Sequence, residues 1–168
     1  MVTMIAVCRE HGHEDVVLAS SYWARPSRGR MTMPSLQLDI TADLPEAQKR
    51  LLARRMSEEY SQIMGSDPRL MTVVIRTLPP GSVWHCTTED PVPGTLLMCD
   101  VRAGRDRATR ERLARRLIDL VAEHGAVDPA HIKVEFTQHS GDEMFHPFLG
   151  GFNRDWDPEE QPPPTDGT

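Results

Sequence analysis

Pro34 has the clearest chemical potential in this chain, because it follows Met33 and opens the alternating apolar and polar segment 36–40. If synthesis starts at Met33 and the methionine is removed, Pro34 becomes a free secondary amine beside a strand. An ordinary α-amino group has a pKa of about 7.7–8.0, which burial or nearby cations lower. Such an amine can act as an acid, a base or a nucleophile near neutral pH. An internal proline instead has an amide nitrogen without basicity, so Pro34 is either a catalytic centre or an ordinary proline that begins a strand.

Two arginines form the second chemical feature. Arg102 and Arg105 stand three residues apart at the end of an apolar run, with Gly104 between them. Two guanidinium groups at a strand end, where a glycine lets the chain turn, can converge on one carboxylate in a bidentate grip. The alternative is that both are solvated surface residues, because more arginines follow on the next predicted helix: Arg107, Arg110, Arg112, Arg115 and Arg116.

The chain divides into three zones by composition. Residues 1–33 have a broken apolar pattern, and we expect an N-terminal extension that is either flexible or the product of a misassigned start. Residues 34–152 carry the periodic signals and are predicted to form one domain. Residues 153–168 are acidic and rich in proline, which predicts a disordered tail.

Composition and charge limit the classes of function. A chain of 168 residues with 39% apolar residues can form a single core without a metal or a disulfide. Much of the net charge of −6 comes from the tail, so we expect no basic face for nucleic acid. No apolar run approaches the ~18 residues of a membrane span, and we expect no targeting segment. The three cysteines lack metal-ligand spacing, which predicts no zinc site and a reduced, cytoplasmic setting. Cys86 and Cys99 lie in apolar, strand-like surroundings and are predicted to be inert small hydrophobic residues.

Periodicity predicts seven elements in the central zone. The first helix is expected to have Asp43 as its N-cap, Pro45 in its first turn and Gly65 at its end, with one apolar face made by Leu52, Met56, Tyr60 and Ile63. The second helix is expected over residues 108–124, with Gly125 as its stop signal. Strands are predicted at 36–40, 70–78, 96–101 and 132–136, with a short extended piece at 83–86. The order gives two β-α-β halves of similar length, which fits either a ferredoxin-like sandwich or the tautomerase fold.

Several motifs decide between these architectures. They are Met33-Pro34, the lysine-containing first helix, Gly65, the Pro80-Gly81 turn, Arg102-Ala103-Gly104-Arg105, His131-Ile132-Lys133-Val134 with Phe136, and Trp156. With these motifs, residues 34–156 resemble the tautomerase superfamily, and most of all its branch that contains cis-3-chloroacrylic acid dehalogenase. The resemblance implies an α/β (α+β) fold of two β-α-β halves, forming a four-stranded sheet with two helices on one face plus short extra strands. It also implies a homotrimer.

The resemblance assigns roles to individual residues. It implies that Pro34 is the catalytic acid or base and that Arg102 and Arg105 bind the substrate carboxylate. Tyr60 stands where the dehalogenase branch has a helix-borne histidine, and Glu135 stands where it has a tyrosine on the last strand, so Tyr60 is a candidate catalytic residue and Glu135 a candidate substrate-binding residue. The position of its water-activating glutamate is taken by His146, a candidate catalytic residue, or by Glu143 if the alignment shifts within the glycine-containing loop. Without that glutamate and the helix-borne histidine, the residues needed for hydrolytic dehalogenation are not all matched.

Other interpretations of the last three candidates stay open. Tyr60 lies on the apolar helix face and can be a core residue with its hydroxyl at the edge. His146, between Phe145 and Pro147, can be a packed loop residue. Glu135 alternates with apolar neighbours and can simply face solvent.

We therefore expect a cofactor-independent and metal-independent tautomerase that moves a proton on a small carboxylated 2-oxo or enol acid. The alternatives are hydration, dehalogenation or decarboxylation on the same scaffold, and a catalytically silent carboxylate-binding relative if Pro34 stays internal. A ferredoxin-like binding module is a third possibility. The expected partners are a small carboxylate substrate and further copies of the chain, with no nucleic acid and no membrane.

Overall fold

The computed structural model describes residues 34–87, 89–140, 143–147 and 151–152. The predicted N-terminal extension, the predicted tail and Trp156 lie outside the described residues. The elements are β1 (Ser35–Ile40), α1 (Glu46–Met64), η2 (Pro68–Leu70), β2 (Thr72–Thr77), β3 (Trp84–His85), β4 (Val92–Pro93), β5 (Thr95–Arg102), α2 (Arg107–Gly125), η3 (Pro129–His131), β6 (Ile132–His139), β7 (Phe145–His146) and β8 (Gly151–Phe152).

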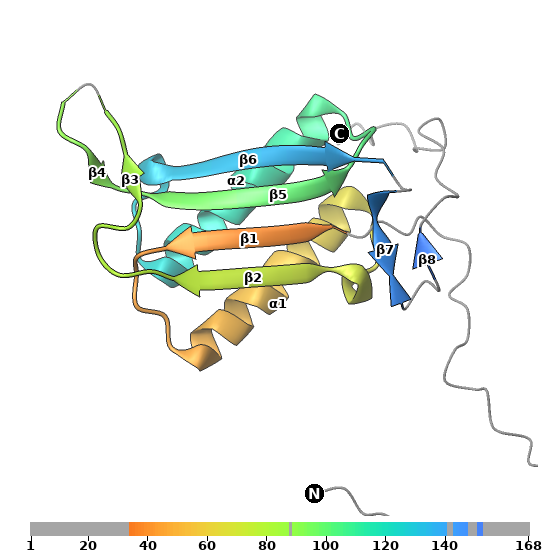
Figure 1. Cartoon of the computed structure of the whole chain (residues 1–168), viewed down its shortest axis with the longest axis horizontal. Coiled ribbons are helices and arrows are strands. Elements are labelled where there is room, and N and C mark those ends of the chain that lie inside the picture. Colours follow the sequence, from red (N-terminus) through yellow and green to blue (C-terminus); the bar gives the residue numbers. More distant parts are fainter. Residues whose placement is uncertain (1–33, 88, 141–142, 148–150, 153–168) are drawn as a thin grey trace, which may run out of the picture.

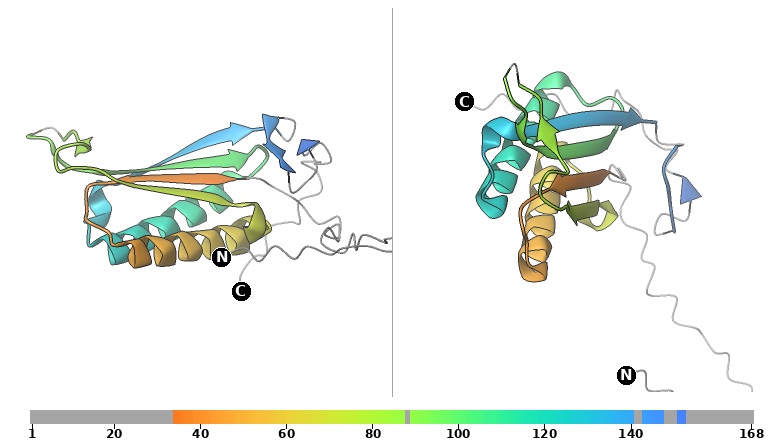
Figure 2. Two further views of the ribbon diagram at one scale, coloured as in Figure 1. Left: turned by 60° about the horizontal axis from the view of Figure 1, so that its bottom comes forward. Right: turned by 60° about the vertical axis from the view of Figure 1, so that its left-hand side comes forward.

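One mixed sheet organises the domain. Its strand order is β2-β1-β5-β6. Strand β1 pairs in parallel with β2, and β5 pairs in parallel with β6, whereas β1 and β5 run antiparallel at the centre. Both long helices cover the same face of this sheet (Figures 1 and 2). The two predicted β-α-β halves are therefore confirmed, and the short ribbons β3–β4 and β7–β8 are the extra strands.

Helix α1 follows its apolar spacing but not its predicted cap. Leu52, Met56, Tyr60 and Met64 recur every fourth residue and are buried, as a single apolar stripe requires. The expectation of an Asp43 cap was wrong, because the N-cap is Pro45, which makes no side-chain cap bond. Its carbonyl instead accepts the backbone N–H groups of Gln48 and Lys49 at 2.9 and 3.0 Å. Gly65 ends the helix in the left-handed conformation at φ 62°, as predicted.

Helix α2 begins at a side-chain cap and ends against the sheet. The carboxylate of Asp106 accepts the backbone N–H of Thr109 at 2.7 Å, which satisfies one of the free donors of the first turn. The helix ends at Gly125, and Ala126 adopts the left-handed conformation at φ 50°. A Cβ on Gly125 would lie 2.7 Å from Cδ1 of Ile40. Gly125 therefore permits a close approach of helix and strand, while Ala126 makes the turn that was predicted for Gly125.

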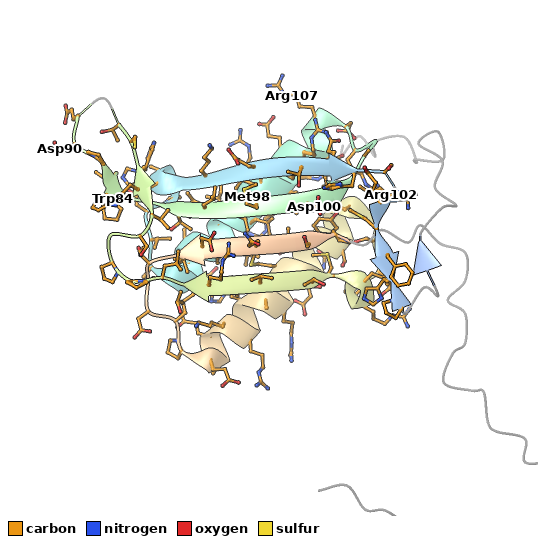
Figure 3. The ribbon with its side chains drawn as sticks, in the orientation of Figure 1. Trp84, Asp90, Met98, Asp100, Arg102 and Arg107 are labelled. Carbon is orange, nitrogen blue, oxygen red and sulfur yellow. The ribbon has the colours of Figure 1, made fainter. Side chains whose placement is uncertain are left out.

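The two faces of the sheet differ in character. The helix-covered face holds the core, which includes Leu36, Leu38, Ile40, Leu97, Cys99 and Val101. The opposite face carries polar pairs such as Asp39 with Arg76, and half-buried apolar side chains such as Met98 (Figure 3). The described helices leave this second face uncovered (Figure 2). Among the described residues, no helix is both long enough and apolar enough to cross a membrane.

The two described cysteines have different environments. Cys99 is fully buried beneath the helices, and burial raises the pKa of its thiol to about 12. The expectation for Cys86 was wrong, because Cys86 is exposed. It follows the two-residue strand β3, and the ribbon that β3 forms with β4 projects beyond the end of the main sheet (Figure 1). No helix covers this ribbon in either view of Figure 2.

Candidate active site

Pro34 and the arginine pair lie at the same edge of the sheet. Strand β1 begins where β5 ends, because the two strands are antiparallel and Ser35 faces Asp100. This register puts Pro34 beside the last residues of β5. On its other side, the carbonyl of Pro34 accepts the backbone N–H of Thr72 at 3.2 Å. Pro34 is therefore held between β2 and β5, close to where Arg102 leaves the sheet, and it is buried.

The two arginines are buried. Arg102 is the last residue of β5 and 2% exposed, and Arg105, just before the cap of α2, is 8% exposed. The chain turns between them at Gly104, whose φ of 92° suits glycine. Arg107, the first residue of α2, is exposed and points away from the sheet (Figure 3). Because a guanidinium group loses hydration when buried, this pair differs from a solvated arginine run, and it concentrates positive charge at this edge of the sheet.

Tyr60 lies beneath this edge, in the core. Its side chain is fully buried on α1. Burial raises the pKa of its hydroxyl above the ordinary value of a tyrosine, although the nearby cation of Arg105 acts in the opposite direction. Its Oη has no hydrogen-bond partner among the described residues. The hydroxyl is thus neutral at physiological pH and buried in the core.

The remaining two candidates occupy different places. His146 belongs to β7, which pairs with β8 and lies near the edge where β5 and β6 end (Figures 1 and 2). Glu135 faces Met98 in the register, four positions before Arg102, and its Oε1 lies 2.5 Å from Nζ of Lys133. Four strand residues span about 13 Å. The structure therefore brings Pro34, Arg102 and Arg105 together, with Tyr60 below them, and it separates Glu135 from them within one chain.

The comparisons with known proteins rest on structure. No family model and no curated protein sequence matches the chain. The protein Pt0534, in a crystal structure after inactivation by 2-oxo-3-pentynoate, aligns with 71% of this chain and 94% of its own at 21% identity and a TM-score of 0.60. N1, a member of the cis-3-chloroacrylic acid dehalogenase family, aligns with 67% of this chain and 79% of its own at 19% identity and a TM-score of 0.59. A fused 4-OT symmetric trimer aligns with 67% of this chain and 90% of its own, at 19% identity and a TM-score of 0.59. The fold is that of the tautomerase superfamily.

Two polar residues at the same edge of this tautomerase fold were not predicted from the sequence. They are Asp100 on β5 and His139 at the end of β6, whose side chains meet at 2.9 Å between Oδ1 and Nε2. Alternation along β5 could have placed Asp100 on the uncovered face. The β-α-β pattern predicts that β5 and β6 pair, but it predicts neither the register that places His139 beside Arg102 nor the extension of β6 past the predicted end at residue 136. The described residues include no group of three or more histidine, cysteine or acidic side chains suited to hold a metal ion.

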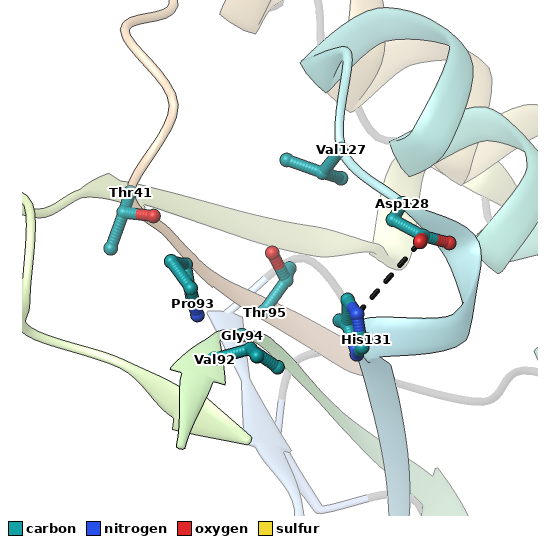
Figure 4. A pocket seen from close by; sticks show the side chains of 8 residues that line it. All are labelled: Thr41, Val92, Pro93, Gly94, Thr95, Val127, Asp128 and His131. Carbon is teal, nitrogen blue, oxygen red and sulfur yellow. Dashed lines mark ion pairs between the residues drawn. The ribbon is translucent and has the colours of Figure 1, made fainter. Parts of the chain in front are cut away.

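Two cavities lie at the opposite end of the tautomerase fold. One has a volume of about 320 Å³ and is lined by residues of β4, the start of β5 and the segment before β6, including the ion pair of Asp128 with His131 at 3.8 Å (Figure 4). The other, of about 670 Å³, shares His131 and also involves Trp84, Cys86 and Glu135. Nδ1 of His85 lies 2.9 Å from Nδ1 of His131 in this region. Neither cavity is lined by Pro34 or by the arginine pair.

Proposed function

We propose that this protein is a tautomerase-like enzyme that moves a proton on a small carboxylated 2-oxo or enol acid. In this proposal Arg102 and Arg105 hold the carboxylate, and Pro34 transfers the proton in a form of the protein that begins at Pro34. The observation that carries the proposal is the burial of both arginines at the sheet edge where β1 begins. The fold supports it, because similar solved structures include Pt0534, which 2-oxo-3-pentynoate inactivates.

The chemistry needs a base with a pKa near neutrality. A free prolyl amine beside two guanidinium groups meets this need, since nearby positive charge disfavours the ammonium form and lowers the pKa from about 7.7–8.0. The neutral amine removes a proton next to the carbonyl, and the other end of the enolate then takes up a proton. The arginines bind the carboxylate and stabilise the negative charge that develops on the enolate.

The other candidate residues enter the proposal with smaller roles. His146, on the ribbon near this edge, is proposed as an auxiliary acid or base. Tyr60 is proposed to support Arg105 from below, since the two groups interact electrostatically. Glu135 remains a prediction for substrate binding, and its distance along the sheet means that it would serve a site other than the one next to Arg102 of its own chain.

We also propose that the protein is a homotrimer. A fused 4-OT trimer has a similar fold, and the sheet of this chain has one face that the described helices leave uncovered (Figure 2). That face includes the exposed side chain of Val74 and the half-buried side chains of Leu96 and Met98, which association would remove from water. Light scattering after size exclusion tests this part of the proposal, and a monomer at micromolar concentration contradicts it.

The decisive experiment concerns the amine. Intact mass and amino-terminal sequencing of the protein expressed from its own gene context show whether chains beginning at Pro34 exist. Turnover of enolisable 2-oxo acids is then measured for a form that begins at Pro34 and for a matched form that retains Met33. We expect the retained methionine to reduce kcat about 10²- to 10⁴-fold, the usual contribution of a positioned acid or base. Equal rates in the two forms contradict the mechanism, and a chain that always keeps Pro34 internal favours the catalytically silent carboxylate-binding relative.

A further inference from the structure

A histidine lies between two carboxylates at the end of β6. Nε2 of His139 is 2.9 Å from Oδ1 of Asp100, and its Nδ1 is 3.6 Å from Oε2 of Glu143. The same oxygen of Asp100 accepts the hydroxyl of Thr137 at 2.8 Å. The same oxygen of Glu143 accepts the backbone N–H and the hydroxyl of Ser140, each at 2.9 Å. Both carboxylates are therefore fixed by further hydrogen bonds, and the imidazole lies between them.

This row of side chains begins at the candidate active site. Asp100 faces Ser35 across the sheet, one residue from Pro34. His139 faces Arg102 in the register of β5 and β6, and its carbonyl accepts the backbone N–H of Ala103 at 2.8 Å. Figure 3 shows Asp100 and Arg102 at the same end of β5. The row therefore runs from the edge where Pro34 lies, across β5 and β6, toward the segment after β6.

Exposure increases along the row. The side chain of Asp100 is 33% exposed, that of His139 is 42% exposed, and that of Glu143 is 59% exposed. One end thus adjoins the buried proline, and the other end is open to water. A proton that enters at Asp100 can leave at Glu143 without crossing the arginine pair.

The arrangement suits proton transfer better than metal binding. A neutral imidazole carries a hydrogen on one nitrogen and a lone pair on the other, so it can accept a proton at one nitrogen and release one from the other. In His139 each nitrogen has its own carboxylate, whereas metal ligands converge on a common point. The other charged groups near His139 are Arg102 on β5 and, through a 2.8 Å bond to Gln138, Arg110 on α2.

We propose that Asp100, His139 and Glu143 form a proton relay that exchanges the proton of Pro34 with solvent, an inference that rests on the proposed function. After Pro34 takes a proton from the substrate, its ammonium gives that proton to Asp100, which passes it to Nε2 of His139, while a water molecule supplies the proton that the other end of the enolate takes up. Nδ1 releases its own proton to Glu143, and Glu143 releases it to water. Within the relay itself only N–H and O–H bonds form and break, and the imidazole regains its first tautomer by exchange with water.

The test uses the form of the protein that begins at Pro34. It compares the wild type with two single variants, His139→Gln and Glu143→Gln. At low buffer concentration we expect each substitution to lower kcat about tenfold or more, while KM stays near the wild-type value because the arginines bind the carboxylate. Added imidazole should restore most of the lost kcat by taking the proton directly. Glu143→Gln is the second variant because the side chain of Glu143 is exposed, so we expect the substitution to leave folding unchanged.

A matched control comes from the other end of the same strand. His131, just before β6, also lies near a carboxylate, with Nε2 3.8 Å from Asp128, and His131→Gln should leave kcat and its response to imidazole unchanged. The relay alone is overturned if the wild-type protein is active and both relay variants keep its kcat. It is also overturned if the variants lose kcat and imidazole does not restore it. Wild-type protein that starts at Pro34 and shows no turnover overturns the proposed function and the relay together.

Discussion

The two ends of the central sheet contain similar side chains in different electrostatic settings. At one end, His139 lies beside Asp100, next to two buried arginines and Pro34. At the other end, His131 lies near Asp128, next to two cavities and the projecting β3–β4 ribbon (Figure 4). Two cavities are described at the cavity end, whereas the arginine end has concentrated buried charge. Because buried charge costs hydration, we take the arginine end, rather than the cavity end, as the proposed carboxylate site.

The comparison also shows how topology builds a site. At the arginine end an antiparallel pair brings the start of β1 to the end of β5, and a parallel pair adds the end of β6. Three segments that are far apart in sequence therefore supply one proline, one arginine and one histidine. At the cavity end the same strands begin or finish, but Asp128 and His131 lie at the short helix η3, and only His85 comes from the two-stranded ribbon.

The largest expected difference between the ends concerns thiol reactivity. In a Cys8→Ser background, Cys86 at the cavity end should react with a thiol reagent at the rate of an ordinary exposed cysteine. Cys99 should react at least about 1,000-fold more slowly, because the thiolate is the reactive form and burial raises the pKa of this thiol to about 12. Mass spectrometry of timed samples measures both rates, and denaturant should make them equal.

The same label also tests which end carries the chemistry. A bulky group on Cys86 enters the larger cavity, which Cys86 lines, and we expect turnover to stay near that of the unlabelled protein. A labelled protein that loses activity as strongly as an arginine variant would show that the cavity end takes part in the reaction.

The second prediction compares buried and exposed arginines. Arg102→Ala and Arg105→Ala should each lower kcat/KM about 10- to 100-fold, since a charge-assisted hydrogen bond is worth about 1.5–3 kcal/mol. Arg107→Ala, at an exposed position two residues after Arg105, should change kcat/KM less than twofold. Arg102→Lys should recover only part of the loss, because lysine cannot make the bidentate contact. Equal effects at all three positions would contradict a specific carboxylate site.

The sequence was sufficient for the fold and for the residue types of the candidate site. Alternation and four-residue spacing predicted both halves and the buried faces of both helices, because these patterns follow from local geometry. The register of β5 with β6 is set by packing, and β6 extends three residues past the predicted strand end at 136, so the contact of His139 with Asp100 was not predicted. The exposure of Cys86 was missed for a related reason, since an apolar pattern does not show whether a strand joins the main sheet.

The third prediction concerns the caps at the two ends. Asp106→Ala should destabilise the protein by about 1 kcal/mol, the usual cost of losing an N-cap. The backbone N–H and then the hydroxyl of Thr109 lower the pKa of Asp106 in the folded protein. The stabilisation is therefore present above the unfolded pKa of about 3.9 and is lost as pH falls through the lower folded value. Urea unfolding at pH 7 and pH 2.5 measures this, with the difference between variant and wild type shrinking at low pH.

Asp128→Ala provides the matched control at the cavity end. Asp128 accepts the backbone N–H of Ala130 at 2.9 Å, but it caps a helix of only three residues. We expect its loss to cost less than that of Asp106, because fewer residues depend on the cap. If Asp128→Ala lowers the free energy of unfolding more than Asp106→Ala does, the cavity end contributes more to global stability than we expect.

The smallest expected effect is that of Tyr60→Phe, and it decides whether Tyr60 belongs to the chemistry or to the core beneath it. The substitution removes a buried hydroxyl that has no hydrogen-bond partner among the described residues, so stability should stay the same or rise by up to about 1 kcal/mol. Turnover should stay within about twofold of wild type, because a hydroxyl whose pKa is raised by burial is a poor proton donor at neutral pH. Tyr60→Leu, which changes the packing under Arg105 as well, should lower stability and raise KM. A tenfold loss of kcat in Tyr60→Phe at unchanged stability would instead place the hydroxyl in the reaction, where it would reach the substrate only after the core opens toward the arginine end.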